Sequence, residues 1–137
     1  MTQQQAYKLT EEEFQRMVIE VAYAYKWMVA HFRKARTLKG WVTPVQADGK
    51  GWLDLVLVRP PRIIFSELKS EKGKLTPEQQ NWMTLLKECQ RVITLEPLEL
   101  ENGRAVMKQV RKARTLVIPE IYLWKPSDWE EIAECLR

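Results

Sequence analysis

The chain has 137 residues, of which 45% are hydrophobic and 29% are charged, and its formal net charge is +4. This fits one soluble globular domain with a core of its own and a modest bias toward polyanionic partners. Two cysteines, one histidine and no long uncharged apolar run argue against a disulfide scaffold, a Cys/His metal site and a membrane-spanning helix. We therefore expect a cytoplasmic protein with free thiols, whose polar N-terminus carries no signal segment.

The first predicted element is a helix from Glu11 to Phe32, preceded by a frayed arm. Thr10 and Glu13 fit a capping box at its start. Glu13 and Glu20 are seven residues apart, so they point to nearly the same side of the helix. The cap alone would account for Glu13, and a surface position alone would account for Glu20. Apolar residues recur at helical spacing, namely Phe14, Met17, Val18, Val21, Ala22, Tyr25 and Met28.

A basic run and a glycine-rich turn separate this helix from the central strands. We expect a short strand near Trp41–Val45 and then a turn that contains Asp48. Asp48 is a rival to Asp54 as an acidic ligand, but Asp-Gly followed by Lys-Gly is typical of a turn. In most proteins such a basic run is only a solvated surface; here it contains Arg33, Lys34, Arg36 and Lys39.

Two apolar, β-branched segments, Leu53–Val58 and Ile63–Leu68, flank a pair of prolines. Short apolar runs divided in this way predict two strands joined by a turn, with the prolines in the turn because proline lacks the N–H that a ladder needs. Side chains alternate across a strand, so Glu67 and Lys69 share a face. The start of one hairpin strand lies beside the end of the next, so we expect Asp54 to lie close to Glu67.

These polar side chains at the end of an apolar hairpin predict a metal site. Two neighbouring carboxylates repel each other and lose hydration, and a divalent cation between them relieves both costs. Oxygen ligands suit Mg²⁺ or Mn²⁺, and Lys69 adds a cation that can hold a phosphate or an attacking water. The alternative is structural, with Asp54 as a strand-entry residue and Glu67 with Lys69 as an exposed ion pair.

The second half of the chain begins with a helix whose N-cap is Thr76, followed by Pro77 and by Gln79 at the third helical position. Between residues 89 and 119, Asn102-Gly103 separates two alternating runs and predicts an inserted β-hairpin. We expect a last strand over Ile118–Leu123 and a last helix over Trp129–Leu136.

Gly51-Trp-Leu-Asp54 followed by Glu67-Leu-Lys69 resembles the PD-(D/E)xK nuclease superfamily, and more narrowly its VRR-NUC branch. The wider match runs from Glu67 to Trp82 and again from Tyr122 to Trp129. It covers most of a single domain, residues 1–137, and leaves out the N-terminal tail and an atypical insertion at residues 89–119. Leu53 differs from the family, which usually has Pro before the metal-binding Asp.

The resemblance implies an α/β, restriction-endonuclease-like αβββαβ core with the inserted β-hairpin and a C-terminal helix. It also implies metal-dependent hydrolysis of DNA that leaves 5′-phosphates. Asp54, Glu67 and the Leu68 carbonyl would bind Mg²⁺ or Mn²⁺, and Lys69 would orient the attacking water or stabilise the phosphate.

Two further positions acquire a role from the resemblance. An acidic residue of the first helix, Glu13 or else Glu20, would help to hold the hydrated metal. Gln79 matches a family glutamine near the active site, although a capping box would account for it equally well.

Contacts with nucleic acid are also implied, because DNA affinity is carried largely by neutralised phosphates. The family often has a histidine on the DNA side of the sheet, and basic residues beside the site would contact phosphates. The insertion would serve either as a DNA-contacting flap or as a dimer-forming element. The candidates are His31, Arg33, Lys34, Arg36, Lys72, Lys74, Arg111, Lys112 and Arg114.

The family members of this size resemble Holliday-junction resolvases, which are found in phage and bacteria and act as symmetric dimers on four-way junctions. A homodimeric resolvase in the cytoplasm, or in the host cytoplasm if phage-encoded, is therefore our first expectation. A flap or general DNA nuclease and a catalytically silent DNA-binding module on the same fold remain as alternatives.

Overall fold

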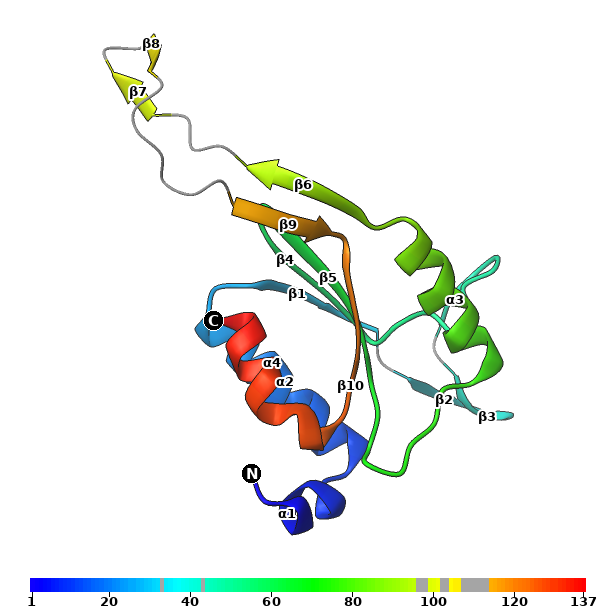
Figure 1. Cartoon of the computed structure of the whole chain (residues 1–137). Coiled ribbons are helices and arrows are strands. Elements are labelled where there is room, and N and C mark those ends of the chain that lie inside the picture. The colour runs from blue at the N-terminus through cyan, green and yellow to red at the C-terminus, as the bar shows by residue number, and fades with distance from the viewer. Residues whose placement is uncertain (33, 43, 96–98, 102–103, 107–113) are drawn as a thin grey trace.

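The computed structural model describes the chain except for residues 33, 43, 96–98, 102–103 and 107–113. Its central sheet has the strand order β1-β4-β5-β10, in which β1, β4 and β5 are antiparallel and β10 runs parallel to β5. This mixed α/β architecture is consistent with the expected restriction-endonuclease-like fold (Figure 1). The strands are β1 (Met28–His31), β4 (Leu55–Arg59), β5 (Arg62–Leu68) and β10 (Glu120–Trp124).

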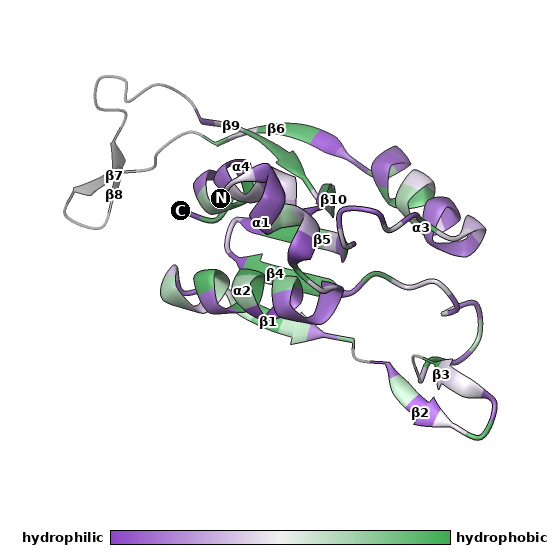
Figure 2. Ribbon diagram, turned by 90° about the horizontal axis from the view of Figure 1, so that it is seen from below, coloured by the Kyte–Doolittle hydropathy of each residue, from purple (hydrophilic) through white to green (hydrophobic). Residues whose placement is uncertain are grey.

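Helices cover both faces of this sheet. On one face, α2 (Glu11–Ala24) and α4 (Trp129–Leu136) pack on a cluster of buried strand residues that includes Leu55 and Leu57. On the other face, Met83 of α3 (Pro77–Glu88) packs with Leu53 and Ile121. In Figure 2 the central strands β4, β5 and β10 are largely green, whereas the helices carry both purple and green residues. The α2–α4 face of the sheet is therefore buried, whereas α3 covers the other face beside β10 and leaves Met28 and Ala30 of the edge strand β1 exposed. Among the helices that the structure describes, none has the length and apolar character needed to cross a bilayer.

The first long helix is shorter than we expected. It begins with the predicted Thr10 capping box but ends at Ala24, and the segment predicted to continue it contains strand β1. Lys26 has a φ of 66°, outside the helical range, and Trp27 is buried in the core. From Met28 onward the backbone pairs with β4, so Val29 lies opposite Leu57. Packing of the tertiary sheet thus overrides a helical spacing of apolar residues, and it supplies the third antiparallel strand of the core.

The N-terminal segment is a helix and not a frayed arm. α1 (Gln3–Lys8) begins with a capping box between Thr2 and Gln5, and Ala6 is buried. The helix lies against η1 (Pro126–Asp128), the short turn before α4. A polar sequence is ordered here because its cap satisfies backbone donors and one small residue packs against the body.

The central hairpin forms as predicted. β4 and β5 pair from Leu55↔Ser66 to Arg59↔Arg62, which places Pro60 and Pro61 in the turn. The Asn102-Gly103 hairpin is also confirmed, since β7 (Glu99–Glu101) pairs with β8 (Arg104–Val106). Residues 102 and 103 themselves lie outside the described part of the chain.

Two further strand pairs flank the sheet. β2 (Ala35–Thr37) and β3 (Gly40–Val42) form a separate two-stranded ribbon, so the strand expected near Trp41 does not join the central sheet. β6 (Arg91–Leu95) pairs with β9 (Arg114–Ile118) at the base of the insertion. The last strand therefore begins at Glu120, two residues later than predicted, whereas the final helix has the predicted bounds.

Gly51 allows the loop before β4 to approach the start of α3. It has a φ of +81°, and a Cβ atom there would lie 2.6 Å from Glu78 Cβ and 2.7 Å from the Gln79 amide nitrogen. We expect Gly51→Ala to lower the free energy of unfolding both through backbone strain, about 1–3 kcal/mol, and through overpacking, about 1–3 kcal/mol. Thermal and urea unfolding measure the effect.

Gly40→Ala is the matched control for this prediction. Its φ is also positive, at +113°, but no described atom lies within 4 Å of the position of a Cβ atom. This variant should show the strain alone. Equal losses for the two variants would contradict a role for the close approach to α3.

Candidate active site

Asp54 and Glu67 meet at one end of the central hairpin. The register Leu55↔Ser66 places the preceding residue, Asp54, across from Glu67. The Asp54 carboxylate is held in place because Oδ2 accepts a hydrogen bond of 2.8 Å from the Leu68 backbone N–H. Both side chains are buried. Asp54 therefore lies close to Glu67, as expected from the pairing of the two hairpin strands.

Glu67 is held by partners from two different elements. Its Oε1 atom accepts a hydrogen bond of 2.6 Å from Gln79 Nε2 on α3 and forms an ion pair of 2.9 Å with Lys69 Nζ. The side chain of Glu67 is 0% exposed and that of Lys69 is 7% exposed. A solvated surface ion pair, the structural alternative for these two residues, is thus contradicted by their burial.

Gln79 takes part in the capping box of α3 and also contacts Glu67. Its Oε1 atom accepts a hydrogen bond of 2.9 Å from the Thr76 backbone N–H and so completes the capping box of α3. Its Nε2 atom is the group that contacts Glu67. One amide therefore joins the start of a helix to a carboxylate on the sheet.

The residue before Asp54 is part of the core. Leu53 is fully buried among Met83 and Ile121, so this departure from the family pattern fills an apolar site. Its neighbour Trp52 makes edge-to-face ring contacts with Phe32, Phe65 and Trp82, at centroid distances of 6.1, 5.8 and 4.9 Å. The loop that carries Asp54 is anchored on both sides.

Burial makes ionisation of both acids unfavourable. Loss of hydration, with a further contribution from the Asp54 charge, raises the pKa of Glu67 to about 7, although the ion pair with Lys69 opposes the change. Loss of hydration also raises the pKa of Asp54, against the hydrogen bond from Leu68. A divalent cation beside the two carboxyl groups would favour their ionised forms and so offset the cost of burying their charges.

The donor set fits a hard divalent cation. Glu67 Oε2 is buried and has no hydrogen-bond partner among the described residues, which leaves one carboxylate oxygen available beside Asp54. Within the same described residues, no three His, Cys, Asp or Glu side chains gather closely enough to hold a metal by themselves. Mg²⁺ commonly binds through one or two carboxylates and completes its shell with water and substrate phosphate, so two carboxylates suffice.

The helix acid near the site is Glu11, which the sequence did not indicate. The Glu11 charge raises the pKa of both Asp54 and Glu67. Glu13 is exposed, and its Oε2 atom accepts hydrogen bonds from the backbone N–H and the hydroxyl of Thr10; Glu20 is also exposed. The Thr10 capping box could have excluded Glu13 at the level of the sequence, because a carboxylate that caps its own helix is not directed at the sheet.

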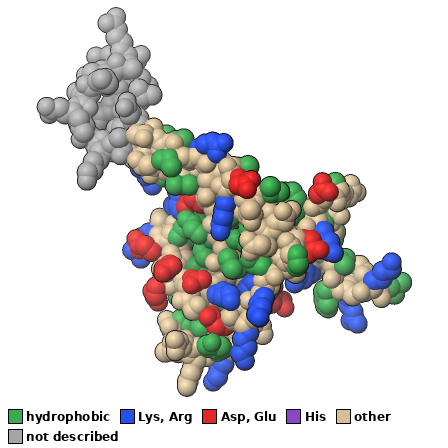
Figure 3. Space-filling view, turned by 45° about the vertical axis from the view of Figure 1, so that its right-hand side comes forward, with side chains coloured by type: hydrophobic (Ala, Val, Ile, Leu, Met, Phe, Trp, Pro, Cys, Tyr) green, Lys and Arg blue, Asp and Glu red, His purple; other side chains and the backbone are tan. Residues whose placement is uncertain are grey.

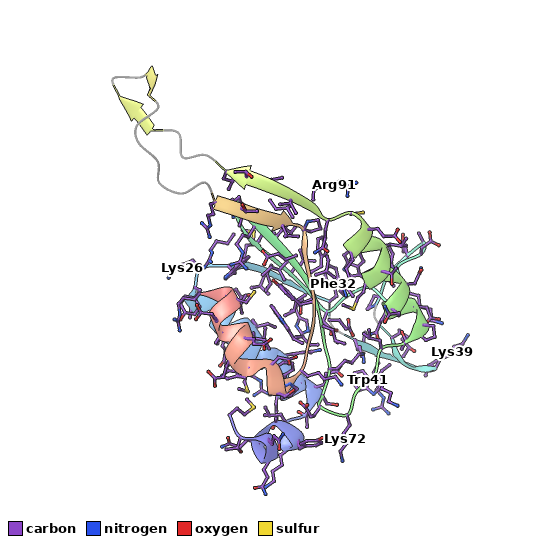
Figure 4. The ribbon with its side chains drawn as sticks, in the orientation of Figure 1. Lys26, Phe32, Lys39, Trp41, Lys72 and Arg91 are labelled. Atoms are coloured by element: carbon purple, nitrogen blue, oxygen red, sulfur yellow. The ribbon has the colours of Figure 1, made fainter. Side chains whose placement is uncertain are left out.

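A cleft of about 530 Å³ opens beside Asp54. One wall is the start of α2, where Glu11 lies 3.8 Å from Lys34 Nζ. Trp41 of the β2–β3 ribbon lines the cleft as well, and Figure 4 shows Phe32 near the centre of the molecule with Trp41 toward the ribbon. The lining residues are Glu11, Glu12, Gln15, Arg16, Ile19, His31, Phe32, Lys34, Trp41 and Asp54.

The structure brings together only part of the predicted nucleic-acid contacts. His31 and Lys34 line the cleft, and Arg36 is exposed on β2. Lys72 and Lys74 are exposed in the loop after β5, where Lys72 Nζ lies 5.9 Å from the centre of the Tyr7 ring. Arg114 is exposed on β9 of the insertion and does not line the cleft. Arg33, Arg111 and Lys112 lie outside the described residues.

Comparison with known protein families gives one match. The family described as VRR-NUC domain matches residues 4–116, which includes α2, the central hairpin, α3 and much of the 89–119 insertion. The match ends before β10 and the Tyr122–Trp129 string. No curated protein and no solved structure matches the chain.

The raised pKa of Glu67 predicts how stability depends on pH without metal. The pKa is about 7 in the folded protein and about 4.3 in an unfolded chain, so unfolding releases a proton between these values. Stability should therefore be greatest below about pH 4.3 as far as this group is concerned and should fall as pH rises toward 7. Melting temperatures in EDTA across this interval test the effect.

Glu67→Gln is the control variant, because a neutral amide of the same shape removes the titration. Its melting temperature should change less between pH 5 and pH 7 than that of the wild type. Added Mg²⁺ or Mn²⁺ should raise the melting temperature of the wild type most at the upper end of the interval, where the carboxylate is ionised. A wild-type stability that rises relative to the variant would refute the buried-acid interpretation.

Proposed function

This chain belongs to the VRR-NUC domain family, a family of nucleases, and on this premise we propose that it is a metal-dependent endonuclease that cuts branched DNA. The proposed first substrate is the four-way Holliday junction, and the proposed metal is Mg²⁺ or Mn²⁺. One observation carries the proposal. The buried carboxylates Asp54 and Glu67 lie together at the end of the hairpin, with a buried oxygen of Glu67 left without a partner among the described residues and Lys69 beside it.

In the proposed reaction, Asp54, Glu67 and the Leu68 carbonyl would hold the metal ion. A divalent cation bound there would lower the pKa of a water molecule and offset the charge that builds up on the phosphate. Gln79 keeps the Glu67 carboxylate in its orientation through the 2.6 Å hydrogen bond. Lys69 Nζ, already beside Glu67, orients the attacking water or stabilises the phosphate. Water adds to phosphorus, the bond to the 3′ oxygen breaks, and the products carry a 5′-phosphate and a 3′-hydroxyl.

Resolution of a four-way junction requires two active sites related by two-fold symmetry, so we propose a homodimer. The base of the insertion offers a suitable contact surface. Val92 of β6 pairs directly with Val117 of β9, and both side chains are exposed, at 70% and 42%. Paired apolar side chains on an exposed strand pair are typical of a surface that another copy can cover.

Removal of one carboxylate should abolish cleavage but not binding. We expect Asp54→Asn to cut a labelled four-way junction at least about 10²-fold more slowly than the wild type, as when one charge-stabilising group is lost at an active site. Nicking of junctions, flaps and linear duplex with Mg²⁺, with Mn²⁺ and with EDTA measures the rate and the metal dependence. Gel shifts of the same DNA should show little change.

The outcomes of this assay separate the alternatives. Preferred cutting of the junction by a protein that sediments as two chains supports the resolvase. Equal or faster cutting of flaps or linear duplex would replace it with a general nuclease. DNA binding without cutting under any metal condition would leave a silent binding module, and undiminished cutting by Asp54→Asn would refute the proposed site.

The role of the helix acid can be tested with two neighbouring variants. Because the Glu11 charge acts on both site carboxylates whereas Glu13 is used for the cap, we expect Glu11→Gln to lower cleavage about tenfold or more, as for groups that act through metal ligands. Glu13→Gln preserves a capping box and should cut at the wild-type rate. The opposite ranking, in junction-nicking assays with both proteins equally folded, would return the role to Glu13.

A further inference from the structure

The β2–β3 ribbon, residues 35–42, exposes apolar side chains beside the cleft. Trp41 is 68% exposed and Val42 is 45% exposed, while Leu38, in the turn between the strands, is fully exposed. The ribbon projects away from the central sheet in both ribbon views (Figures 1 and 2). An exposed tryptophan and leucine on a projecting ribbon are costly in water unless a partner covers them.

The charge of the ribbon indicates which kind of partner. Residues 34–42 contain Lys34, Arg36 and Lys39 and no acidic residue, and all three cations are exposed. In the space-filling view, blue and green side chains lie together on the arm that projects to the right (Figure 3), and Figure 4 shows Lys39 at the far end of the ribbon. Basic and apolar side chains in alternation match a chain of phosphates and bases.

The register of the ribbon places a cation and an aromatic ring on the same face. Arg36 and Trp41 are directly paired across the two strands, and directly opposite residues of an antiparallel pair point to the same side. Trp41 also lines the cleft that contains Asp54. Trp41 on this face therefore borders the candidate active site, and Arg36 is its direct neighbour outside the residues that line the cleft.

The size of the cleft fits one nucleotide unit. Its volume of about 530 Å³ lies within the range of small-ligand sites, about 300–1,000 Å³. Its acidic lining residues are Glu11 and Glu12 of α2 and Asp54, whereas Trp41 comes from β3. A base against Trp41 would thus lie on the ribbon side of the cleft, with its phosphates toward the exposed cations of the ribbon, Arg36 and Lys39.

From these observations we propose that the β2–β3 ribbon binds an unpaired nucleotide next to the scissile phosphate, with Trp41 stacked on the base and Arg36 and Lys39 on the phosphates. Only an unpaired or terminal base offers a free face to an indole, because inside a duplex both faces are covered by neighbouring bases. The preferred substrate class is therefore DNA with unpaired bases at the cut, as where the branch point of a junction is opened. This inference rests on the proposed function for its DNA substrate, but its test does not require cleavage.

Binding is measured in the Asp54→Asn background with EDTA, so that no DNA is cut. Fluorescence anisotropy follows a labelled oligothymidine strand, a forked duplex and a blunt duplex of equal length. We expect Trp41→Ala to weaken binding of the strand and the fork about tenfold, the effect of losing one stacked base, with little change for the blunt duplex. Trp41→Phe should recover most of the loss.

Tyr23→Ala is the matched control, because Tyr23 is an aromatic residue of similar exposure, 57%, that does not line the cleft. It should leave all three affinities unchanged, and melting curves should show both alanine variants folded. Unchanged binding by Trp41→Ala, or an equal loss for duplex, would overturn the proposal. So would a change in sedimentation mass on Trp41→Ala, since the face would then be a contact between two copies.

The same data distinguish this inference from the proposed function. If the wild type cuts no DNA with Mg²⁺ or Mn²⁺ while the Trp41-dependent preference holds, the nuclease proposal fails and the nucleotide site stands. If cleavage is efficient but Trp41→Ala binds and cuts forks as the wild type does, the nucleotide site fails alone.

Discussion

The arrangement of this protein depends on the contacts of one buried carboxylate, that of Glu67, where the central sheet packs against α3. Glu67 is fully buried on β5. Its Oε1 atom contacts both Lys69, just after the end of β5, and Gln79 on α3. A buried charge is costly unless it is paired and hydrogen-bonded, so these contacts fix the position of α3 relative to the sheet. They leave the second oxygen of Glu67 without a partner among the described residues, and this is the oxygen that the proposed metal ion would contact.

Parts of the fold that look purely structural support this site. The Thr76 capping box orients the amide that contacts Glu67, and the close approach of Gly51 lets the Asp54 loop meet the start of α3. Trp52 packs among three aromatic rings just before Asp54. At the far end of the hairpin, Arg62 binds Glu120 through two hydrogen bonds of 2.7 and 2.8 Å, which ties β10 to β5. Glu67 is thus carried by a strand and Asp54 by a loop that is anchored to the core on both sides, and such fixed positions are what precise chemistry requires.

The polar residues at the end of the hairpin and the residues of the β2–β3 ribbon differ in how far they are exposed to solvent. Asp54, Glu67 and Lys69 are buried and held by contacts with the body of the protein, as suits groups that must hold a fixed geometry. Arg36, Leu38 and Trp41 stand on a small separate ribbon and are exposed, as suits groups that meet a large and variable partner. Under the two proposals above, the sheet would supply the reaction and the ribbon would supply the choice of substrate.

Local patterns in the sequence determined the hairpin around the proline pair, the capped starts of α2 and α3, the final helix and the proximity of Asp54 to Glu67, because turn residues, caps and strand alternation act over a few neighbouring residues. The VRR-NUC resemblance rested on the same short strings. Only the tertiary structure decided that Met28–His31 is a strand, that Glu11 and not Glu13 lies near the carboxylates, and that Trp41 borders the cleft. Each of these depends on which surfaces meet across the sheet, and contacts between residues far apart in the chain leave no periodic signal in the sequence.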